Sequence, residues 1–352
     1  MEGTKVATLK MKASILEALN TPLVLDEVQV PDLDWGQVLV QVHRSGICGA
    51  QLAEIAGLRG EDKHLPHLLG HEGGGVVVDV GIGVTQVRKG DHVVMHWRKG
   101  AGIQSGPPVY RRDNGVVGAG WVTTFNEYAV VSENRVTRVP KEIPFEVAAL
   151  MGCAVTTALG LINNEARVKV GQSVAVLGCG GVGLNVVQGA AMVSADPIIA
   201  IDIYDQKLKM ATAFGATRLI NSTRSDVTEE IRKIVGSKGV DVFVDTTGLA
   251  QLIQQAYELT SATGRTVVVG TPHFDQEIAV RSLALHAGKS LVVCDGGQTN
   301  PTEDIPRYLS LYSRGKLKLE QLITHRYPLS EINMALETIR NGEAGRCMLM
   351  IM

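Results

Sequence analysis

The spacing of hydrophobic and polar positions changes twice along the chain. From Ala13 to about Val139, short hydrophobic runs are broken by glycine, proline and aspartate, a pattern typical of β-strands joined by tight turns. From Val168 to about Val293, hydrophobic strand segments alternate with stretches of helical period, which indicates a parallel sheet covered by helices on both faces. The last segment returns to a mixed pattern, with two amphipathic helices and a final strand, CMLMIM.

Length also favours more than one domain, because single hydrophobic cores stop growing at about 250 to 300 residues and this chain has 352. We predict that residues 1–166 and 300–352 form one β-rich domain. Residues 167–299 form a doubly wound α/β domain with a parallel sheet. Two domains of this size imply a cleft between them.

Charge and composition exclude several classes of protein. Lys and Arg number 34 against 36 Asp and Glu, a net charge of -2, and no basic cluster is dense enough to follow nucleic-acid phosphates. The five cysteines are scattered and odd in number, which favours a reducing compartment over a disulfide framework. The N-terminal segment lacks the apolar run of a signal peptide, and the uncharged stretch 170–195 holds six glycines, unlike a membrane span. We therefore expect a cytoplasmic protein that binds neither nucleic acid nor membrane.

A glycine-rich turn opens the α/β domain. The strand Ser173–Leu177 runs into Gly178-Cys179-Gly180-Gly181-Val182-Gly183, and a helix-like stretch follows directly. Glycines in such a G-x-G-x-x-G turn allow close backbone approach, so a pyrophosphate can lie at the helix N-terminus, where free N–H groups favour negative charge. The strand, the turn and the helix together predict a dinucleotide site.

Asp202 ends the second strand of this unit, nineteen residues after Gly183. A carboxylate there accepts hydrogen bonds from both ribose hydroxyls and repels a 2′-phosphate, which favours NAD over NADP. The alternative is an Asp202 that is merely exposed at a strand end.

Three residues of the β-rich domain, Cys48, His71 and Cys153, are of the types that zinc prefers as ligands. His71 and Glu72 follow a glycine at a turn that leads into a strand. Two thiolates and a neutral imidazole leave zinc formally uncharged yet Lewis acidic, with a fourth position open to an alcohol oxygen. Each residue alone is more often a buried small side chain or a turn residue. Together with the dinucleotide motif they favour hydride transfer from an alcohol to NAD.

These motifs resemble the zinc-dependent alcohol dehydrogenases of the medium-chain dehydrogenase/reductase superfamily over nearly the whole chain. The stretches that carry the resemblance are SGICG (45–49), LLGHEGGGVVVDVGIGVTQVRKGDHV (68–93), GCAVTTALG (152–160), VLGCGGVG (176–183), FGAT (214–217) and NGEAGR (341–346). The resemblance implies a Rossmann NAD-binding domain, a GroES-like catalytic domain and a homodimer or homotetramer.

The resemblance also implies roles for individual residues. Cys48, His71 and Cys153 match the zinc ligands, and Glu72 matches the acid beside the metal, which can approach it during ligand exchange. Trp97 matches a bulky wall of the substrate pocket. The remaining matches are cofactor contacts: Thr157 and Val182 for the nicotinamide, Asp202 and Lys207 for the adenosine ribose, and Arg346 for the pyrophosphate. For Lys207 the alternative is a solvated charge on a helix.

The chain departs from the family pattern at two places. Members commonly hold a structural zinc with four cysteines after the Gly-Asp-His block, but the stretch from His96 to Thr124 contains no cysteine, so we expect one catalytic zinc per chain and no structural zinc. The first zinc cysteine is usually followed by Ser or Thr, then Asp, and often His, where this chain has Ala50, Gln51 and Ala53. Ala50 cannot relay the proton of the alcohol, and Gln51 cannot be the charged partner that orients a zinc-bound histidine.

We hypothesise that His96 or an ordered water replaces the missing relay. An unchanged pH dependence of turnover in a His96→Ala variant would exclude His96.

The predicted function is an oxidoreductase that transfers a hydride between NAD and a zinc-bound secondary alcohol, polyol or sugar-like substrate. One alternative is a zinc-free NAD(P)H-dependent reductase of the quinone reductase type, against which the Cys-His-Cys set counts. Another is a non-catalytic dinucleotide-binding protein, an interpretation that Ala50 keeps open. Zinc content separates the prediction from the first alternative, and turnover of NAD with any alcohol separates it from the second.

Overall fold

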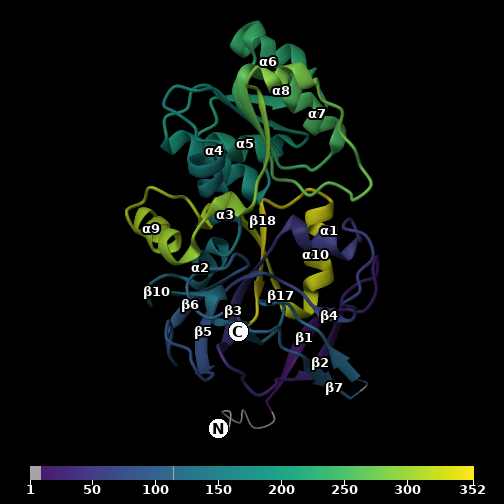
Figure 1. Ribbon diagram of the computed structural model, residues 1–352, viewed down its shortest axis with the longest axis vertical. Helices are drawn as coiled ribbons and strands as arrows, with labels where there is room; N and C mark the ends of the chain where they lie inside the picture. The colour runs from purple at the N-terminus through teal and green to yellow at the C-terminus, as the bar shows by residue number, and fades with distance from the viewer. Residues whose placement is uncertain (1–8, 114) are drawn as a thin grey trace. The chain divides into compact units, whose positions relative to one another are not determined.

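The computed structural model of the chain describes residues 9–113 and 115–352, which divide into two compact units (Figure 1). The first unit joins Met1–Cys153 to Asn300–Met352, and the second is Ala154–Thr299. The sequence predicts a boundary near residue 166; in the structure, helix α3 (Ala154–Gly160) lies with the second unit because it packs against α4 (Gly181–Met192).

One sheet of the first unit is antiparallel, with the strand order β4-β1-β2-β7-β8. In β1 the side chains of Lys10 and Lys12 are exposed while those of Met11 and Ala13 are buried, so alternate residues face solvent and core. Its strands are β1 (Lys10–Leu16), β2 (Val24–Gln29), β4 (His67–Leu68), β7 (Tyr110–Arg112) and β8 (Gly115–Val117).

The other sheet of the first unit has the order β10-β6-β5-β3-β18-β17, with β9 also paired to β3. Only its β17–β18 pair is parallel among the described pairings, and β18 brings the C-terminal segment beside β3. Its strands are β3 (Gln37–Ile47), β5 (Glu72–Val80), β6 (His92–His96), β9 (Tyr128–Ser132), β10 (Val136–Val139), β17 (Ile323–Pro328) and β18 (Arg346–Met350).

Short helices cover the core of the first unit. In the last α-helix, Ile332, Ala335 and Leu336 are buried at the i, i+3, i+4 spacing of one helix face and pack with Leu16 and Phe125. The helical elements of this unit are α1 (Gly49–Ile55), η1 (Glu133–Arg135), α2 (Phe145–Met151), α9 (Pro301–Ser313), η5 (Glu320–Leu322), η6 (Leu329–Glu331) and α10 (Ile332–Arg340).

The second unit is built on a six-stranded parallel sheet of order β13-β12-β11-β14-β15-β16, as the alternating pattern predicts. The strand order reverses direction at β11, so the carboxyl ends of β11 and β14 flank a switch point, where ligands bind in open α/β sheets. The strands are β11 (Val174–Leu177), β12 (Ile198–Asp202), β13 (Arg218–Asn221), β14 (Val240–Asp245), β15 (Thr260–Val268) and β16 (Ser290–Val293).

Helices connect these strands and share a core with them. Ala175, Ile199, Ile201 and Phe243 are each at most 1 % exposed, consistent with strands that are buried on both faces. Besides α3 and α4, the helical elements are η2 (Leu161–Glu165), α5 (Asp205–Phe214), α6 (Val227–Val235), η3 (Gly236–Lys238), α7 (Ala250–Leu259), α8 (Ser282–His286) and η4 (Gly296–Gln298).

In the part of the chain that the structure describes, no single helix is both long and hydrophobic enough to cross a membrane. A bent pair, Phe145–Met151 with Ala154–Glu165, meets the length and composition requirement only when its two segments are taken together.

Candidate functional site

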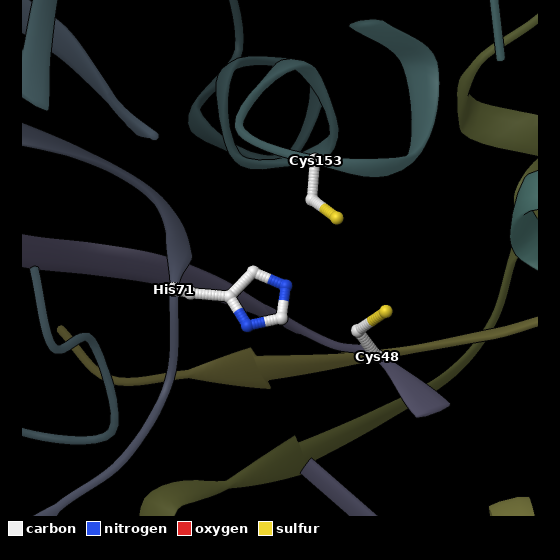
Figure 2. Close-up of side chains that lie close together, drawn as sticks. All are labelled: Cys48, His71 and Cys153. Carbon is white, nitrogen blue, oxygen red and sulfur yellow. The ribbon is translucent and has the colours of Figure 1, made fainter. Parts of the chain in front are cut away.

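Cys48, His71 and Cys153 come together in the first unit (Figure 2). Each residue offers one ligand atom, and these atoms lie within 4.8 Å of one another. Cys48 immediately precedes α1, His71 precedes β5 and Cys153 lies just beyond α2. Three elements that are distant in sequence therefore place two sulfurs and one imidazole around a common point.

The Cys48 thiol is prepared to ionise. A hydrogen bond with Cys153 holds the pKa of Cys48 well below its usual value, and His71 and Arg346 lower it further against the opposing effect of burial. Since the thiolate is the form that binds metals, the surroundings of Cys48 favour its role as a ligand.

The His71 ring is also suited to be a metal ligand. Its Nε2 atom is buried and has no hydrogen-bond partner among the described residues, although buried polar atoms are nearly always paired. A nitrogen in that position beside two thiols is explained by a metal, and two sulfurs with one imidazole nitrogen are a donor set that suits zinc. The residues present therefore fit the predicted ion.

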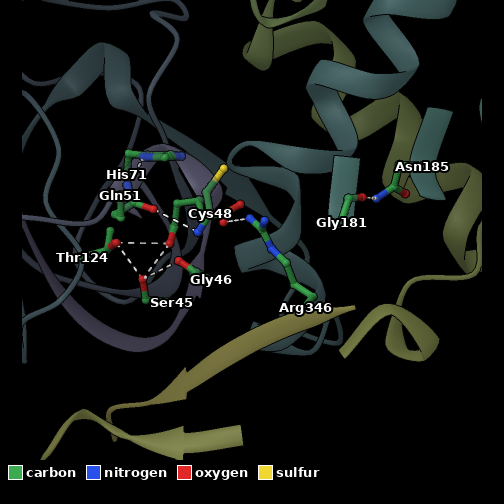
Figure 3. A network of polar contacts seen from close by, with 10 residues as sticks. Ser45, Gly46, Cys48, Gln51, His71, Thr124, Gly181, Asn185 and Arg346 are labelled. Carbon is green, nitrogen blue, oxygen red and sulfur yellow. Dashed lines mark hydrogen bonds and ion pairs between the residues drawn. The ribbon is translucent and has the colours of Figure 1, made fainter. Parts of the chain in front are cut away.

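Gln51 contacts two of these three residues (Figure 3). Helix α1 begins after Cys48, and Gln51, its third residue, accepts the backbone N–H of Cys48 on Oε1 at 3.0 Å, as in one half of a capping box. The Nε2 atom of the same amide contacts Nδ1 of His71. The neutral Gln51 thus orients His71, a contact that its residue type alone did not predict.

A pair of hydroxyl groups secures the backbone beside His71 (Figure 3). The carbonyl oxygen of Glu72 lies 3.0 Å from Oγ of Ser45 and 3.2 Å from Oγ1 of Thr124, and these two hydroxyls are 2.7 Å apart. All three residues are fully buried. No sequence pattern pointed to Ser45 and Thr124, because isolated hydroxyl residues carry no motif.

The Glu72 side chain forms an ion pair with Arg346. Glu72 is 0 % exposed and Arg346 is 5 % exposed, so each charge depends on the other for compensation. The sequence assigns Glu72 to the metal surroundings and Arg346 to the cofactor pyrophosphate; the structure brings the two together next to Cys48. The pyrophosphate contact of Arg346 stays a prediction.

His96 is buried at the end of β6 with both ring nitrogens bonded. Nδ1 donates to the carbonyl oxygen of Arg98 at 2.6 Å, and Nε2 accepts from the hydroxyl of Thr137 at 2.9 Å. Burial lowers the pKa of His96 to about 4. The ring is therefore neutral near pH 7, and a proton relay through it would first have to break one of these bonds.

Trp97, the predicted wall of the substrate pocket, follows β6 directly. It is partly buried and packs against the hydrophobic cluster of the first unit that contains Val38 and Val77. The guanidinium of Arg98 lies 5.7 Å from the centre of its ring. Its part in a substrate pocket stays a prediction.

The predicted dinucleotide site lies in the second unit, at the carboxyl end of β11. Gly180 is the N-cap of α4, and a Cβ added there would meet no atom within 4 Å, so a ligand has room to approach the backbone. At Gly183 a Cβ would lie 1.9 Å from the carbonyl oxygen of Gly178, so only glycine fits this turn. Gly181 and Val182 form the first turn of α4, where N–H groups are free to bind an anion.

Asp202 joins the end of β12 to the glycine turn. Its Oδ2 accepts the backbone N–H of Cys179 at 2.7 Å, and its Oδ1 accepts that of Tyr204 at 2.9 Å. Asp202 is 7 % exposed, which disfavours the alternative of a merely exposed strand-end carboxylate. Lys207 lies nearby, with Nζ 5.0 Å from the centre of the Tyr204 ring, and Thr157 is buried in α3.

Comparison with known proteins adds to this geometry. Residues 34–141 match the family model of the alcohol dehydrogenase GroES-like domain, and residues 181–314 match that of the zinc-binding dehydrogenases. S-(hydroxymethyl)glutathione dehydrogenase of Paracoccus denitrificans is 30 % identical, and the match covers 97 % of this chain and 100 % of that protein.

Solved structures show the same architecture. An alcohol dehydrogenase zinc-binding domain protein from Burkholderia ambifaria superposes with a TM-score of 0.90 at 29 % identity, covering 98 % of this chain and 100 % of that one. Benzyl alcohol dehydrogenase from Acinetobacter calcoaceticus superposes with a TM-score of 0.88 at 26 % identity over the same shares. The predicted fold, a Rossmann domain with a GroES-like domain, is confirmed.

Proposed function

Because this chain belongs to the zinc-dependent alcohol dehydrogenases of the medium-chain dehydrogenase/reductase superfamily, we propose that it transfers a hydride between NAD and a secondary alcohol, polyol or sugar-like substrate. Alcohol oxidoreduction follows from the family; the cofactor and the substrate class are the proposal. The observation that carries it is the convergence of two thiols on the buried Nε2 of His71, for which the described part of the chain offers no hydrogen-bond partner.

The residues of the first unit have distinct tasks in this reaction. Cys48 and Cys153 would hold the metal as thiolates, and His71 as a neutral imidazole. Once bound, zinc would supply a Lewis acid that polarises the alcohol, and NAD would accept the hydride. Arg346, held by its ion pair with the buried Glu72, lowers the pKa of Cys48 and so favours the thiolate.

Asp202 supports NAD as the cofactor. Its carboxylate is held by two backbone N–H groups at the end of β12, where an adenosine ribose lies in this fold class. A 2′-phosphate would approach this negative charge, so NADP should bind more weakly than NAD.

The proton that leaves the alcohol needs a route that does not use Ala50. Both nitrogens of His96 are already bonded within the protein, which supports an ordered water over His96 as the carrier. The habit of the family supports a homodimer or homotetramer, and the lack of cysteine between His96 and Thr124 supports one zinc in each chain with no structural zinc.

Metal analysis combined with a substrate survey tests the proposal. Purified protein should contain about one zinc per chain and reduce NAD with at least one member of a panel of secondary alcohols, polyols and sugar derivatives. The panel should include S-(hydroxymethyl)glutathione and benzyl alcohol, named for two similar proteins. Less than about half a zinc per chain after zinc-replete expression contradicts the proposal, and about two contradicts the absence of a structural site.

Two cysteine variants give the survey a matched control. Cys48→Ser should lose zinc and activity together, whereas Cys294→Ser, which lies outside the metal cluster, should keep both. Equal zinc content in the two variants would argue that the metal binds elsewhere.

A further inference from the structure

The Gln51 side-chain amide lies between two potential hydrogen-bond donors beside the candidate metal site, the backbone N–H of Cys48 and the Nδ1 group of His71. Its Oε1 accepts the backbone N–H of Cys48 at 3.0 Å, and its Nε2 contacts Nδ1 of His71 (Figure 3). Gln51 is 1 % exposed, so its amide is shielded from bulk water. Gln51 is therefore the hydrogen-bonding partner that governs the Nδ1 atom of His71.

Metal binding places a requirement on His71. The buried Nε2 atom is the ring nitrogen that points toward the thiols (Figure 2), and to bind a metal it must keep its lone pair. In a neutral imidazole the proton then lies on Nδ1, which becomes a donor. The Nε2 group of Gln51 carries only donors, so two N–H groups would face each other.

Turning the amide over does not remove this conflict. Oε1 would then accept the Nδ1 proton of His71, but Nε2 would face the backbone N–H of Cys48, which is also a donor. An amide has one acceptor oxygen for two N–H groups placed on its opposite sides, whereas a carboxylate has two. The mismatch holds for either orientation of the Gln51 side chain.

We propose that Gln51 is a positioning residue that lowers the affinity of this site for its metal. Whenever His71 binds the metal, the Gln51 amide leaves one buried N–H without an acceptor. The inference rests on the proposed zinc function. Partners of metal-bound histidines change metal affinity by about 10- to 100-fold. Zinc should accordingly leave this enzyme faster than it would with a carboxylate in the same place.

Gln51→Glu tests the inference, because it keeps the side-chain length and supplies both acceptors. The holoenzyme is mixed with excess chelator, and the rate of zinc release is measured. We expect Gln51→Glu to release zinc about 10-fold more slowly than the wild type. If Gln51→Glu does not fold, Gln51→Asp carries the same two acceptors on a shorter stem, with the same expected direction.

Gly49→Glu is the matched control for charge. Gly49 is exposed at the first position of the same helix, and a Cβ there meets no atom within 4 Å. This variant adds the same negative charge next to Cys48 but does not accept hydrogen bonds from the N–H groups of Cys48 and His71. Its rate of zinc release should therefore stay within about twofold of the wild-type rate. Equal slowing in Gly49→Glu and Gln51→Glu would overturn the inference, because charge alone would explain it.

The outcomes also separate this inference from the proposed function. Wild-type protein with about one zinc per chain and an unchanged release rate in Gln51→Glu overturns only the role of Gln51. A wild-type protein that takes up no zinc would overturn both the proposed function and the inference on Gln51.

Discussion

The ion pair of Glu72 and Arg346 shows how a single side chain can affect the stability of the first unit. Arg346→Met would leave the Glu72 carboxylate buried without a partner, which costs about 3 to 5 kcal/mol. Urea unfolding should show this loss. The control is Arg340→Met, since the pair of Arg340 and Glu337 is about half exposed and is worth at most about 1 kcal/mol. Equal losses in the two variants would contradict the prediction.

His96 should make stability depend on pH. Burial lowers its pKa to about 4, whereas an unfolded histidine has a pKa of about 6.5. Between these values the unfolded state binds more protons, so the free energy of unfolding falls as the pH drops from about 6.5 to 4. The total loss should approach 3 kcal/mol, at about 1.4 kcal/mol per pH unit.

Comparing His96→Gln with the wild type isolates this effect. Unfolding by urea at pH 7 and pH 5 should show a smaller decrease for the variant, because glutamine does not titrate. Parallel pH profiles would mean that His96 does not titrate as its burial implies.

At the scale of elements, the turn between β11 and α4 separates a structural glycine from a ligand-binding one. Gly183→Ala places a methyl group against the carbonyl oxygen of Gly178, so we expect loss of stability as well as of NAD binding. Gly180→Ala has open space around its Cβ, so stability should change by less than about 1 kcal/mol while NAD binding weakens. Thermal unfolding and NAD titration of both variants test this, and a Gly180→Ala variant with wild-type NAD affinity would place the pyrophosphate elsewhere.

Elements were predictable to different degrees. The run VDVFVD predicts a strand over residues 240–245, and β14 covers Val240–Asp245, because four of its six residues are valine or phenylalanine, which favour strands. The run RTVVVG predicts a strand from residue 265, yet β15 begins at Thr260. Its pairing with β14 includes Val240 beside Thr260 and an irregularity after it. Contact with the neighbouring strand extends β15 beyond its hydrophobic run.

At the scale of the whole molecule, the two predicted ligands are assigned to different units. Cys48, His71 and Cys153 belong to the first unit, whereas the glycine turn and Asp202 belong to the second. In calorimetry, removal of zinc should lower the unfolding temperature of the first unit. NAD at 100 times its Kd should stabilise the second by about 2.7 kcal/mol. If NAD left every zinc-independent transition unchanged, the assignment of its site to the second unit would be wrong.

The amino-acid sequence by itself determined the family, the fold class, the glycine turn and the three residues suited to zinc. The family was indicated by the resemblance of its motifs, whereas the fold class, the glycine turn and the ligand types follow from local properties, since periodicity, turn residues and ligand types are all present within short segments. Only the tertiary structure decided that the three ligand atoms lie within 4.8 Å, that Arg346 compensates Glu72 and that Gln51 contacts His71. Such contacts join segments distant along the chain, and they depend on strand register and packing, which no local pattern encodes.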